Sequence, residues 1–559
     1  MIVQALRPQT SGASSTLSTF SSLSVTERQK HDSFSLSGSV FLITSDGEIV
    51  SLPIPSENPR DPLNWTWKTR ALALVLIGIF GYVGLVATQG ASVVSSGLAK
   101  EFPYEKSAPF TIETLITAPT LFMGLGTFIW VPLTFAVGRR PVFIMASLLM
   151  LIACLGAAFS KTFYQLLIFV SLLGLAEGFT FGVTSLIIID LTFIHQRPSA
   201  IAMVVAVVGF TGTPSVGFVP FMTDHGRAWH RFYLFWSIPV GVAAVAALLL
   251  FPETYFKRPI VAYDGRTFVQ TATEKLVIYE DDEQDGSDRS IYNKTLPIAP
   301  SRSYIRSLTD QFSITRATRT SWKSMLLCYP QVFFCSLNPL IFWVVIITAV
   351  NFAGMMFIGA TYAMVLSDPP YKLPSYVIIN VNTCAGVGSL LAWPLGGYLV
   401  CAILKRLAKR NKGVREAEHY LVGYILPVIA GSLSTLLYGL AVHYHWHFGI
   451  YYFSYGINSF SYIALNITNT LWVTEAFPRW AAPALVVVGG GSLVASFAMS
   501  YALVPWIAAQ GHLFVGVELT AIQIITGLLF LPAVFWGKGL RQHIHGPWTE
   551  RREGALRPL

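Results

Sequence analysis

Long apolar runs, separated by short polar segments, organise this chain. Six runs lie at about 72–97, 114–136, 141–159, 164–189, 200–222 and 231–251, and six more at about 331–361, 373–402, 420–443, 448–473, 481–508 and 513–536. A helix needs about 20 apolar residues to cross the hydrocarbon core of a bilayer, and each run comes close to that length. The pattern predicts an all-α polytopic membrane protein with 12 transmembrane helices in two six-helix bundles.

Polar segments set the predicted domain limits. We expect an N-terminal tail at 1–70, an N-terminal six-helix bundle at 71–252, a linker at 253–330, a C-terminal six-helix bundle at 331–537 and a C-terminal tail at 538–559. The linker carries five acidic side chains at 280–285, which makes it too polar to enter a bilayer.

Lys and Arg are concentrated in every second loop, including the loops around 139–140 and 405–415. Positively charged short loops stay in the cytoplasm. We therefore expect both termini to be cytoplasmic. The expected location is the plasma membrane, with the vacuolar membrane as the alternative.

Composition narrows the class of protein further. Apolar residues make up 53% of the chain and charged residues 12%, against about 25% charged residues in soluble domains. The formal net charge of +9 comes from residues that fall in bursts between uncharged runs. This excludes a soluble enzyme, a disordered scaffold and a nucleic-acid binder. We expect no enzyme activity, no cofactor and no metal site, since the His443, His445 and His447 cluster is better explained as a solvated turn than as a metal site.

Short motifs recur at the ends of the predicted helices. They are NPRDPLNW at 58–65, GRRPV at 138–142, the pattern of Asp190, Phe193, His195 and Arg197, PETY at 252–255, DPPY at 368–371 and NKGVREAE at 411–418. Together they resemble fungal proteins of the major facilitator superfamily, in the twelve-spanner drug:proton antiporter branch of polyamine, drug and secondary-metabolite exporters. The resemblance implies the major facilitator fold and secondary transport by alternating access.

The same resemblance suggests gating residues. Arg139 and Arg140 look like the loop that closes the first-half gate, where they would hold helix carbonyls or the carboxylates of Asp190 and Glu475. Arg197 belongs to the same set. The alternative is that the arginines anchor their loop at anionic headgroups.

Two positions depart from the family pattern. Phe135 stands where the family has an aspartate, and Val170 aligns with the family's span-4 arginine. A proton relay through that arginine therefore does not carry over to this chain. In span 5, Gly209, Pro214 and Gly217 resemble the antiporter signature, whose small residues permit close helix approach.

Glu177 is the candidate proton or cation site. It lies in the middle of the predicted span 4, where a charge costs about 2.5–3.5 kcal/mol on insertion scales. The alternative is a protonated Glu hydrogen-bonded to a neighbouring helix.

A polar row follows one face of the predicted span 10, at Tyr451, Tyr455, Asn458, Tyr462, Asn466 and Asn469. Such a row avoids lipid, so it faces either a central substrate cavity or hydrogen-bonding partners on other helices. Tyr82, Gln89, Asn351 and Asn380 are further candidates for the substrate pathway.

The sequence therefore predicts a monomeric secondary transporter that exports a small organic compound in exchange for protons. Its expected partners are a small-molecule substrate, protons if transport is coupled, and the lipid bilayer, with no nucleic acid. The alternatives are uptake or facilitated diffusion of a small solute, and a transporter-like solute sensor.

Overall fold

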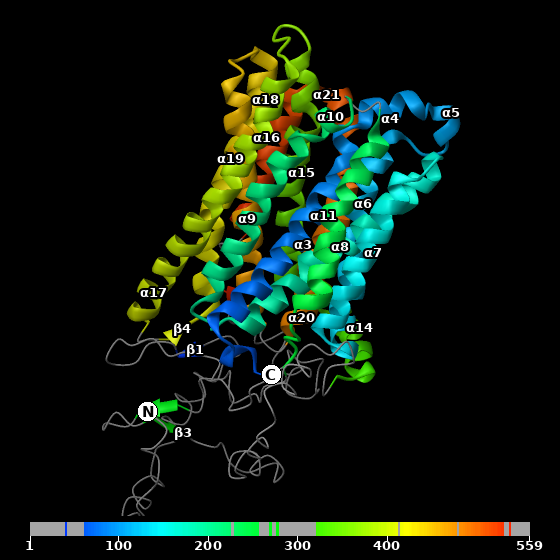
Figure 1. Ribbon diagram of the computed structural model, residues 1–559. Coiled ribbons are helices and arrows are strands. Elements are labelled where there is room, and N and C mark those ends of the chain that lie inside the picture. Colours follow the sequence, from blue (N-terminus) through cyan, green and yellow to red (C-terminus); the bar gives the residue numbers. More distant parts are fainter. Residues whose placement is uncertain are drawn as a thin grey trace, which may run out of the picture.

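The computed structural model describes residues 61–224, 228–256, 320–411, 414–477, 480–529 and 536–537, and the short segments 40–41, 268–270 and 276–278. Long helices running side by side make up nearly all of this part of the chain (Figure 1).

In the first half, six long helices follow one another. They are α3 (Trp67–Val93), α6 (Ile112–Val137), α7 (Arg139–Ala158), α8 (Phe163–Leu191), α9 (Arg197–Gly217) and α11 (Trp229–Leu250). Four short elements join or precede them, namely η2 (Pro62–Asn64), α4 (Ser95–Glu101), α5 (Tyr104–Ser107) and α10 (Val219–Met222).

The second half begins with α14 (Trp322–Ser336) and continues with α15 (Pro339–Ser367). Several of its spans are composite. The remaining elements are α16 (Ser375–Ala392), η5 (Trp393–Leu399) and α17 (Val400–Arg410), then η6 (Ala417–Tyr424) and α18 (Ile425–Tyr444), then α19 (Gly449–Ala476), and finally α20 (Ala481–Val486), η8 (Val487–Gly491) and α21 (Ser492–Leu528).

The described residues account for 12 crossings. Ten segments are long and apolar enough to cross a membrane, and one of them, Ala481–Leu528, has 48 residues. That segment holds two crossings, because Gly511 adopts a φ of 78° and breaks α21. The 28-residue α19 completes the set, although its Tyr and Asn side chains lower its hydropathy. The predicted twelve-helix fold is therefore confirmed.

Two short antiparallel ribbons accompany the helices. β1 (Val40–Phe41) pairs with β4 (Val414–Arg415), and β2 (Phe268–Gln270) pairs with β3 (Leu276–Ile278). Neither ribbon belongs to a membrane-spanning run, so the fold remains all-α in its bundles.

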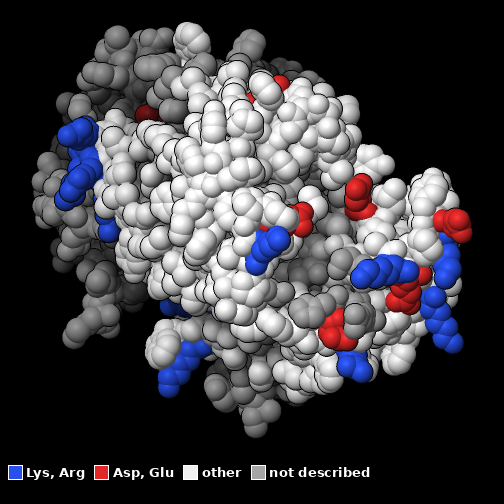
Figure 2. Space-filling model, turned by 90° about the horizontal axis from the view of Figure 1, so that it is seen from above, with Lys and Arg blue, Asp and Glu red and all other residues white. Residues whose placement is uncertain are grey.

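Two ends of the molecule are distinguished here. The end that carries α14, α17 and α20 is called the linker end, and the end that carries α4 and α5 is called the α4 end (Figure 1). Figure 2 views the α4 end from above and shows a mostly uncharged surface, on which basic and acidic side chains are interspersed.

Side-chain caps set several helix starts. Thr162 accepts a hydrogen bond from Gln165 N–H at 3.3 Å at the start of α8, and Asn338 accepts one from Leu340 N–H at 3.0 Å at the start of α15. Asn338 is followed by Pro339, which suits the first position of a helix. The apolar run at 331–361 is thereby divided, since its first residues belong to α14 and the rest to α15.

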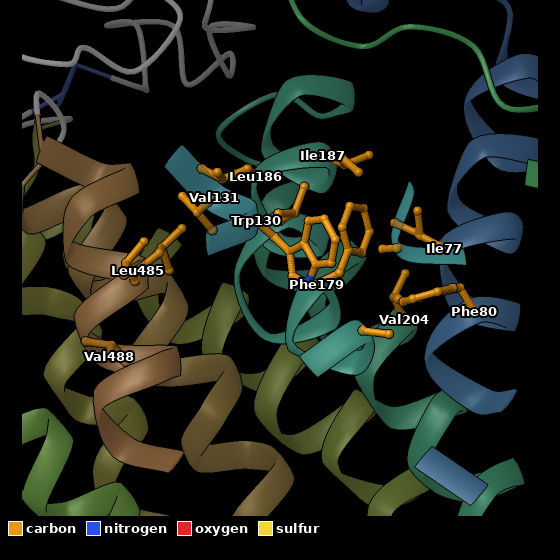
Figure 3. Packing of buried hydrophobic residues seen from close by; sticks show 14 of the residues in the cluster. Ile77, Phe80, Trp130, Val131, Phe179, Leu186, Ile187, Val204, Leu485 and Val488 are labelled. Carbon is orange, nitrogen blue, oxygen red and sulfur yellow. The ribbon is translucent and has the colours of Figure 1, made fainter. Parts of the chain in front are cut away.

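Buried apolar side chains join the helices of both halves (Figure 3). In the first half, the rings of Phe80, Phe143 and Phe179 lie within 5.2–5.4 Å of one another. Trp130 of α6 donates its indole N–H to the carbonyl oxygen of Leu175 in α8 at 2.7 Å. Such aromatic packing fixes the spacing of α3, α6, α7 and α8.

The halves meet along two equivalent contacts. α9, the fifth span, packs against α16, the second span of the other half, and α6, the second span, packs against the fifth span of the other half, formed by η8 and α21. At the second contact, a Cβ on Gly124 would lie 2.8 Å from the carbonyl oxygen of Gly490, so only glycine permits this approach. The repeat of the contact reflects the internal symmetry of a two-bundle transporter.

Candidate functional site

Glu177 lies buried between α8 and α3, with 2% of its surface exposed. Thr88 of α3 donates its hydroxyl to Glu177 Oε2 at 2.6 Å. Gly84, one turn earlier in α3, leaves room for the carboxyl group, because a Cβ there would lie 3.3 Å from Glu177 Cδ. Within the described residues, no Lys, Arg or His forms an ion pair with Glu177. The carboxyl group therefore has a hydroxyl partner and no counter-ion.

Several of the predicted Asn side chains form hydrogen bonds within the second half. Asn458 donates to Ser434 Oγ of α18 at 2.7 Å, and Asn469 donates to Thr348 Oγ1 of α15 at 2.7 Å. Asn351 of α15 donates to Ser461 Oγ at 2.8 Å. These bonds link α15, α18 and α19 to one another.

The tyrosines at the α4 end of α19 also have partners in the second half. Tyr455 stacks on Tyr362 of α15 with ring centroids 5.7 Å apart, and Tyr451 donates to the carbonyl oxygen of Ala441 at 3.1 Å. The Tyr451 and Tyr455 side chains therefore pack within the second bundle.

Tyr462 is the residue of the row that reaches toward the first half. Its phenol group interacts electrostatically with the Glu177 carboxyl group, and its ring lies 5.6 Å from that of Phe352. Asn466, one turn further along, donates to the Tyr462 carbonyl oxygen at 2.8 Å. The Tyr462 phenol group of α19 therefore lies within electrostatic range of the Glu177 carboxyl group of α8.

The remaining pathway candidates lie apart from one another. The Tyr82 hydroxyl is 3.1 Å from Ser215 Oγ of α9, and its ring packs edge-on against Trp236 of α11. Gln89 is half-buried in α3, and Asn380 is exposed on α16. Tyr82 thus ties three helices of the first half together.

Arg139 is completely buried at the linker end. Its Nε lies 3.3 Å from Asp190 Oδ2, and it also donates to Thr134 Oγ1. Its guanidinium group lies over the rings of Phe135 and Tyr255, at 5.5 and 5.6 Å from the ring centroids. Phe135, at the position where the sequence resemblance implies an aspartate, therefore contacts the arginine through a cation–π interaction.

Glu253 completes this group, and the sequence analysis did not assign it a role. Its carboxylate accepts backbone N–H bonds from Arg139 at 3.0 Å, Arg140 at 3.2 Å and Tyr255 at 2.8 Å. The helix α7 has no side-chain cap of its own, because its N-cap is Gly138 with a φ of 109°. Glu253 supplies the missing acceptor at the positive end of the helix dipole. Burial nevertheless raises the pKa of the Glu253 carboxyl group, although these N–H bonds and Arg139 lower it.

Arg140 contacts α11 at the same end of the bundle. Its Nη2 donates to the Leu248 carbonyl oxygen near the end of α11 at 2.7 Å. The two arginines therefore hold one carboxylate, Asp190, and one helix-terminal carbonyl, which are the two kinds of partner that the sequence suggested.

Arg197 and Glu475 form an ion pair between the two halves. Arg197 Nη1, at the start of α9, lies 2.9 Å from Glu475 Oε1, near the end of α19, with side-chain exposures of 1% and 7%. Both residues were predicted as gating residues, but the sequence did not pair them. The pair bridges the halves at the linker end.

The antiporter-like motif lies at the α9–α16 contact. A Cβ on Gly209 would lie 2.8 Å from Ser389 Cβ, and one on Gly217 would lie 2.7 Å from Ile379 Cγ2. Pro214 occupies the space that a Cβ on Gly386 would need, at 2.8 Å. The motif therefore forms half of a tight interface between the bundles.

Among the described residues, no group of three or more His, Cys, Asp or Glu could hold a metal ion. The five cysteines carry free thiols.

Comparison with known proteins decides the family. Residues 75–500, most of the chain, match the family described as the Major Facilitator Superfamily. The chain belongs to the major facilitator superfamily. It is therefore a membrane transporter rather than an enzyme, as the sequence predicted.

Relatives within the superfamily come from fungi. An uncharacterized MFS-type transporter of Schizosaccharomyces pombe is 23% identical, with 91% of this chain and 90% of the relative covered. The protein named efflux pump radE of Floropilus chiversii is 24% identical, with 79% of this chain and 75% of the relative covered. A crystal structure of a POT family transporter in complex with 5-aminolevulinic acid is similar with a TM-score of 0.54 at 12% identity, and the match covers 86% of this chain and 99% of that one. The structural similarity confirms the major facilitator fold.

Proposed function

We propose that this superfamily member exports a small organic compound in exchange for protons, and that the Glu177 carboxyl group carries the proton. The observation that carries the proposal is the buried Glu177, which has a hydroxyl partner in Thr88 and no ion-pair partner among the described residues. An ionised carboxylate in such a place is costly, so the group binds a proton or a cation in part of the transport cycle.

The position of Glu177 suits an exchange of proton for substrate. Thr88 and Glu177 belong to two helices of the first half, whereas Tyr462, which interacts electrostatically with Glu177, belongs to the second half. Rocking of the halves therefore changes the surroundings of the carboxyl group. A state that exposes it to water favours the ionised form, and a state that buries it favours the protonated form.

The linker-end ion pair fits the role of a lock in this cycle. Arg197 and Glu475 belong to different halves, so the linker end opens only if their 2.9 Å contact breaks. Arg139, Asp190 and Glu253 lie within the first half and keep the ends of α7, α8 and α11 together. On this proposal the Arg197–Glu475 contact breaks and re-forms in each cycle, whereas the contacts among Arg139, Asp190 and Glu253 persist.

Two observations support export of an organic solute, namely the name of one relative and the buried carboxyl group of Glu177. One relative bears the name efflux pump, and a buried acid bordered by hydroxyl groups suits a mildly polar or cationic organic solute. We place both termini and the linker end in the cytoplasm, since the loops at this end hold most of the short-loop Lys and Arg.

Transport in sealed vesicles tests the proposal. The purified chain is reconstituted, a pH gradient is imposed, and flux of three organic cations (ethidium, rhodamine 6G and spermidine) is followed together with internal pH. We expect gradient-driven flux with an opposite proton flux. Glu177→Gln should abolish the response to the gradient while substrate exchange without a gradient continues.

Glu113→Gln is the matched control, because Glu113 is an exposed acid at the start of α6. It should leave coupling unchanged. Flux that ignores the pH gradient would replace antiport with facilitated diffusion. Gradient-driven flux by Glu177→Gln at the wild-type rate would remove the carboxyl group from the proton pathway.

A further inference from the structure

The helix α17 extends α16 beyond the bundle and presents basic side chains (Figure 1). Leu404 and Ala408, which are 3% and 2% exposed, form its buried face against α9 and η6. Its charged residues are all basic and all exposed, namely Lys405, Arg406, Lys409 and Arg410. Within the described part of the chain, none of these four side chains takes part in an ion pair.

The exposed side of this long helix changes from apolar to basic along its length. Leu391, Leu395 and Tyr398 are 50%, 37% and 61% exposed, and the basic residues follow within two turns. At 1.5 Å per residue, Lys405 lies about 10 Å and Lys409 about 16 Å beyond Tyr398. Because each headgroup layer is about 5–8 Å thick and Lys and Arg side chains are long, Lys405 reaches the level of lipid phosphates. Lys409 lies about one Debye length, roughly 8 Å, beyond that layer.

The helix α14 marks the same level on another side of the linker end (Figure 1). Trp322, Leu326 and Phe333 of α14 are 52%, 65% and 63% exposed, while Cys328 and Cys335 pack inward. Trp is enriched where a protein crosses the membrane interface. The exposed apolar surface therefore reaches the linker end near α14 as well as near α16.

Charges at the α4 end are arranged differently. Lys100 is followed by the acid Glu101, and Lys106 follows the acid Glu105, so these two basic side chains have acidic neighbours in the sequence. Acidic and basic side chains lie among one another on this end (Figure 2). After α17, the next acids in the sequence are Glu416, whose side chain caps η6, and Glu418 in the first turn of η6. Within the described part of the chain, the basic face of α17 therefore carries its positive charges without an ion pair.

We propose that α17 binds the phosphate headgroups of anionic phospholipids. A basic surface that directly continues a lipid-facing apolar stripe is complementary to a lipid with an apolar tail and a negative headgroup. Each basic side chain at such a surface strengthens attraction by about fivefold. This site is independent of the proton-coupled export proposed above.

Spin-labelled lipids test this site. The full chain is reconstituted in phosphatidylcholine vesicles that contain a trace of spin-labelled phosphatidylserine or phosphatidylcholine, and the immobilised fraction is measured. We expect the wild type to prefer phosphatidylserine, and more so at low salt. Replacing all four basic residues should reduce the preference by at least about tenfold; the variant is Lys405→Gln, Arg406→Gln, Lys409→Gln and Arg410→Gln.

The matched control removes four exposed basic residues from the α4 end: Lys100→Gln, Lys106→Gln, Lys161→Gln and Arg231→Gln. It should keep the wild-type preference. Both variants are compared with the wild type by elution volume and thermal stability, so that misfolding is detected.

Three results would overturn the site. One is a wild type without lipid preference, and another is equal loss in both variants. The third is a preference that appears only after the acids at 280–285 are replaced by amides, since the linker would then be the occupant of α17.

Discussion

Removing one partner of the Arg197–Glu475 pair should open the linker end. Glu475→Gln keeps the size of the side chain but leaves the buried Arg197 side chain, which is 1% exposed, without its charged partner. Breaking a buried ion pair in this way costs about 3–5 kcal/mol. Since 1.4 kcal/mol is a factor of ten, the closed arrangement should lose roughly two to three and a half powers of ten relative to an open one.

Cysteine labelling measures this shift. Ala202 of α9 is 0% exposed, and its Cβ lies 2.9 Å from the position of a Cβ on Gly397, in the second half. A cysteine introduced by Ala202→Cys is therefore shielded while the linker end is closed. Its alkylation by N-ethylmaleimide, followed by mass spectrometry, should be at least about 100-fold faster in the Glu475→Gln background.

The double variant separates a lost contact from general damage. Arg197→Leu with Glu475→Leu leaves no buried charge, and replacing a buried pair by apolar groups is often neutral. Its labelling should therefore be slower than that of Glu475→Gln. The reasoning fails if Glu475→Gln labels at the wild-type rate, or if the double variant labels as fast as the single one.

Two further predictions concern packing and pH. Gly209→Ala should lower the thermal stability by about 1–3 kcal/mol, because the added Cβ overpacks against Ser389. Gly78→Ala is the control and should leave the stability unchanged, since nothing lies within 4 Å of its added Cβ. Equal melting temperatures of the two variants would contradict the prediction. Burial raises the pKa of the Glu253 carboxyl group, so the folded chain keeps the carboxyl proton at pH values where the unfolded chain has lost it. The stability that Glu253 contributes therefore falls as the pH rises above the pKa of the unfolded state. Melting temperatures between pH 4.5 and 7 should show this slope in the wild type but not in Glu253→Gln, and parallel curves would refute it.

The fold was largely predictable because hydropathy and helix length dominate a membrane chain. The hydropathy pattern gave one apolar run at 331–361, whereas the structure divides this run between α14 and α15. The start of α15 depends on the Asn338 cap and on Pro339, which a hydropathy pattern does not register. For α19 the apolar run at 448–473 already indicated a span, and the helical spacing of its Tyr and Asn residues indicated which face of that span is polar.

The sequence indicated candidate residues for the site, but it did not indicate which of them contact one another. Periodicity placed Asn458 in the polar row of α19, yet it does not tell whether Ser434 or a substrate lies opposite. Arg197 and Glu475 are 278 residues apart, so their contact depends on how the two bundles meet. The role of Glu253 was missed for the same reason, because its partners are backbone N–H groups of a helix that begins more than a hundred residues earlier.

The helix α19 carries both Tyr462 and one partner of the lock, Glu475, which are 13 residues apart, a rise of about 20 Å. The other partner, Arg197, belongs to α9, which follows α8 and its Glu177 in the first half. If the halves rock as rigid bodies, the surroundings of Glu177 and the contact at Glu475 change together without any side-chain relay between them. A Glu475→Gln variant that labels rapidly yet transports with wild-type coupling would show instead that the linker end opens without a change in the surroundings of Glu177.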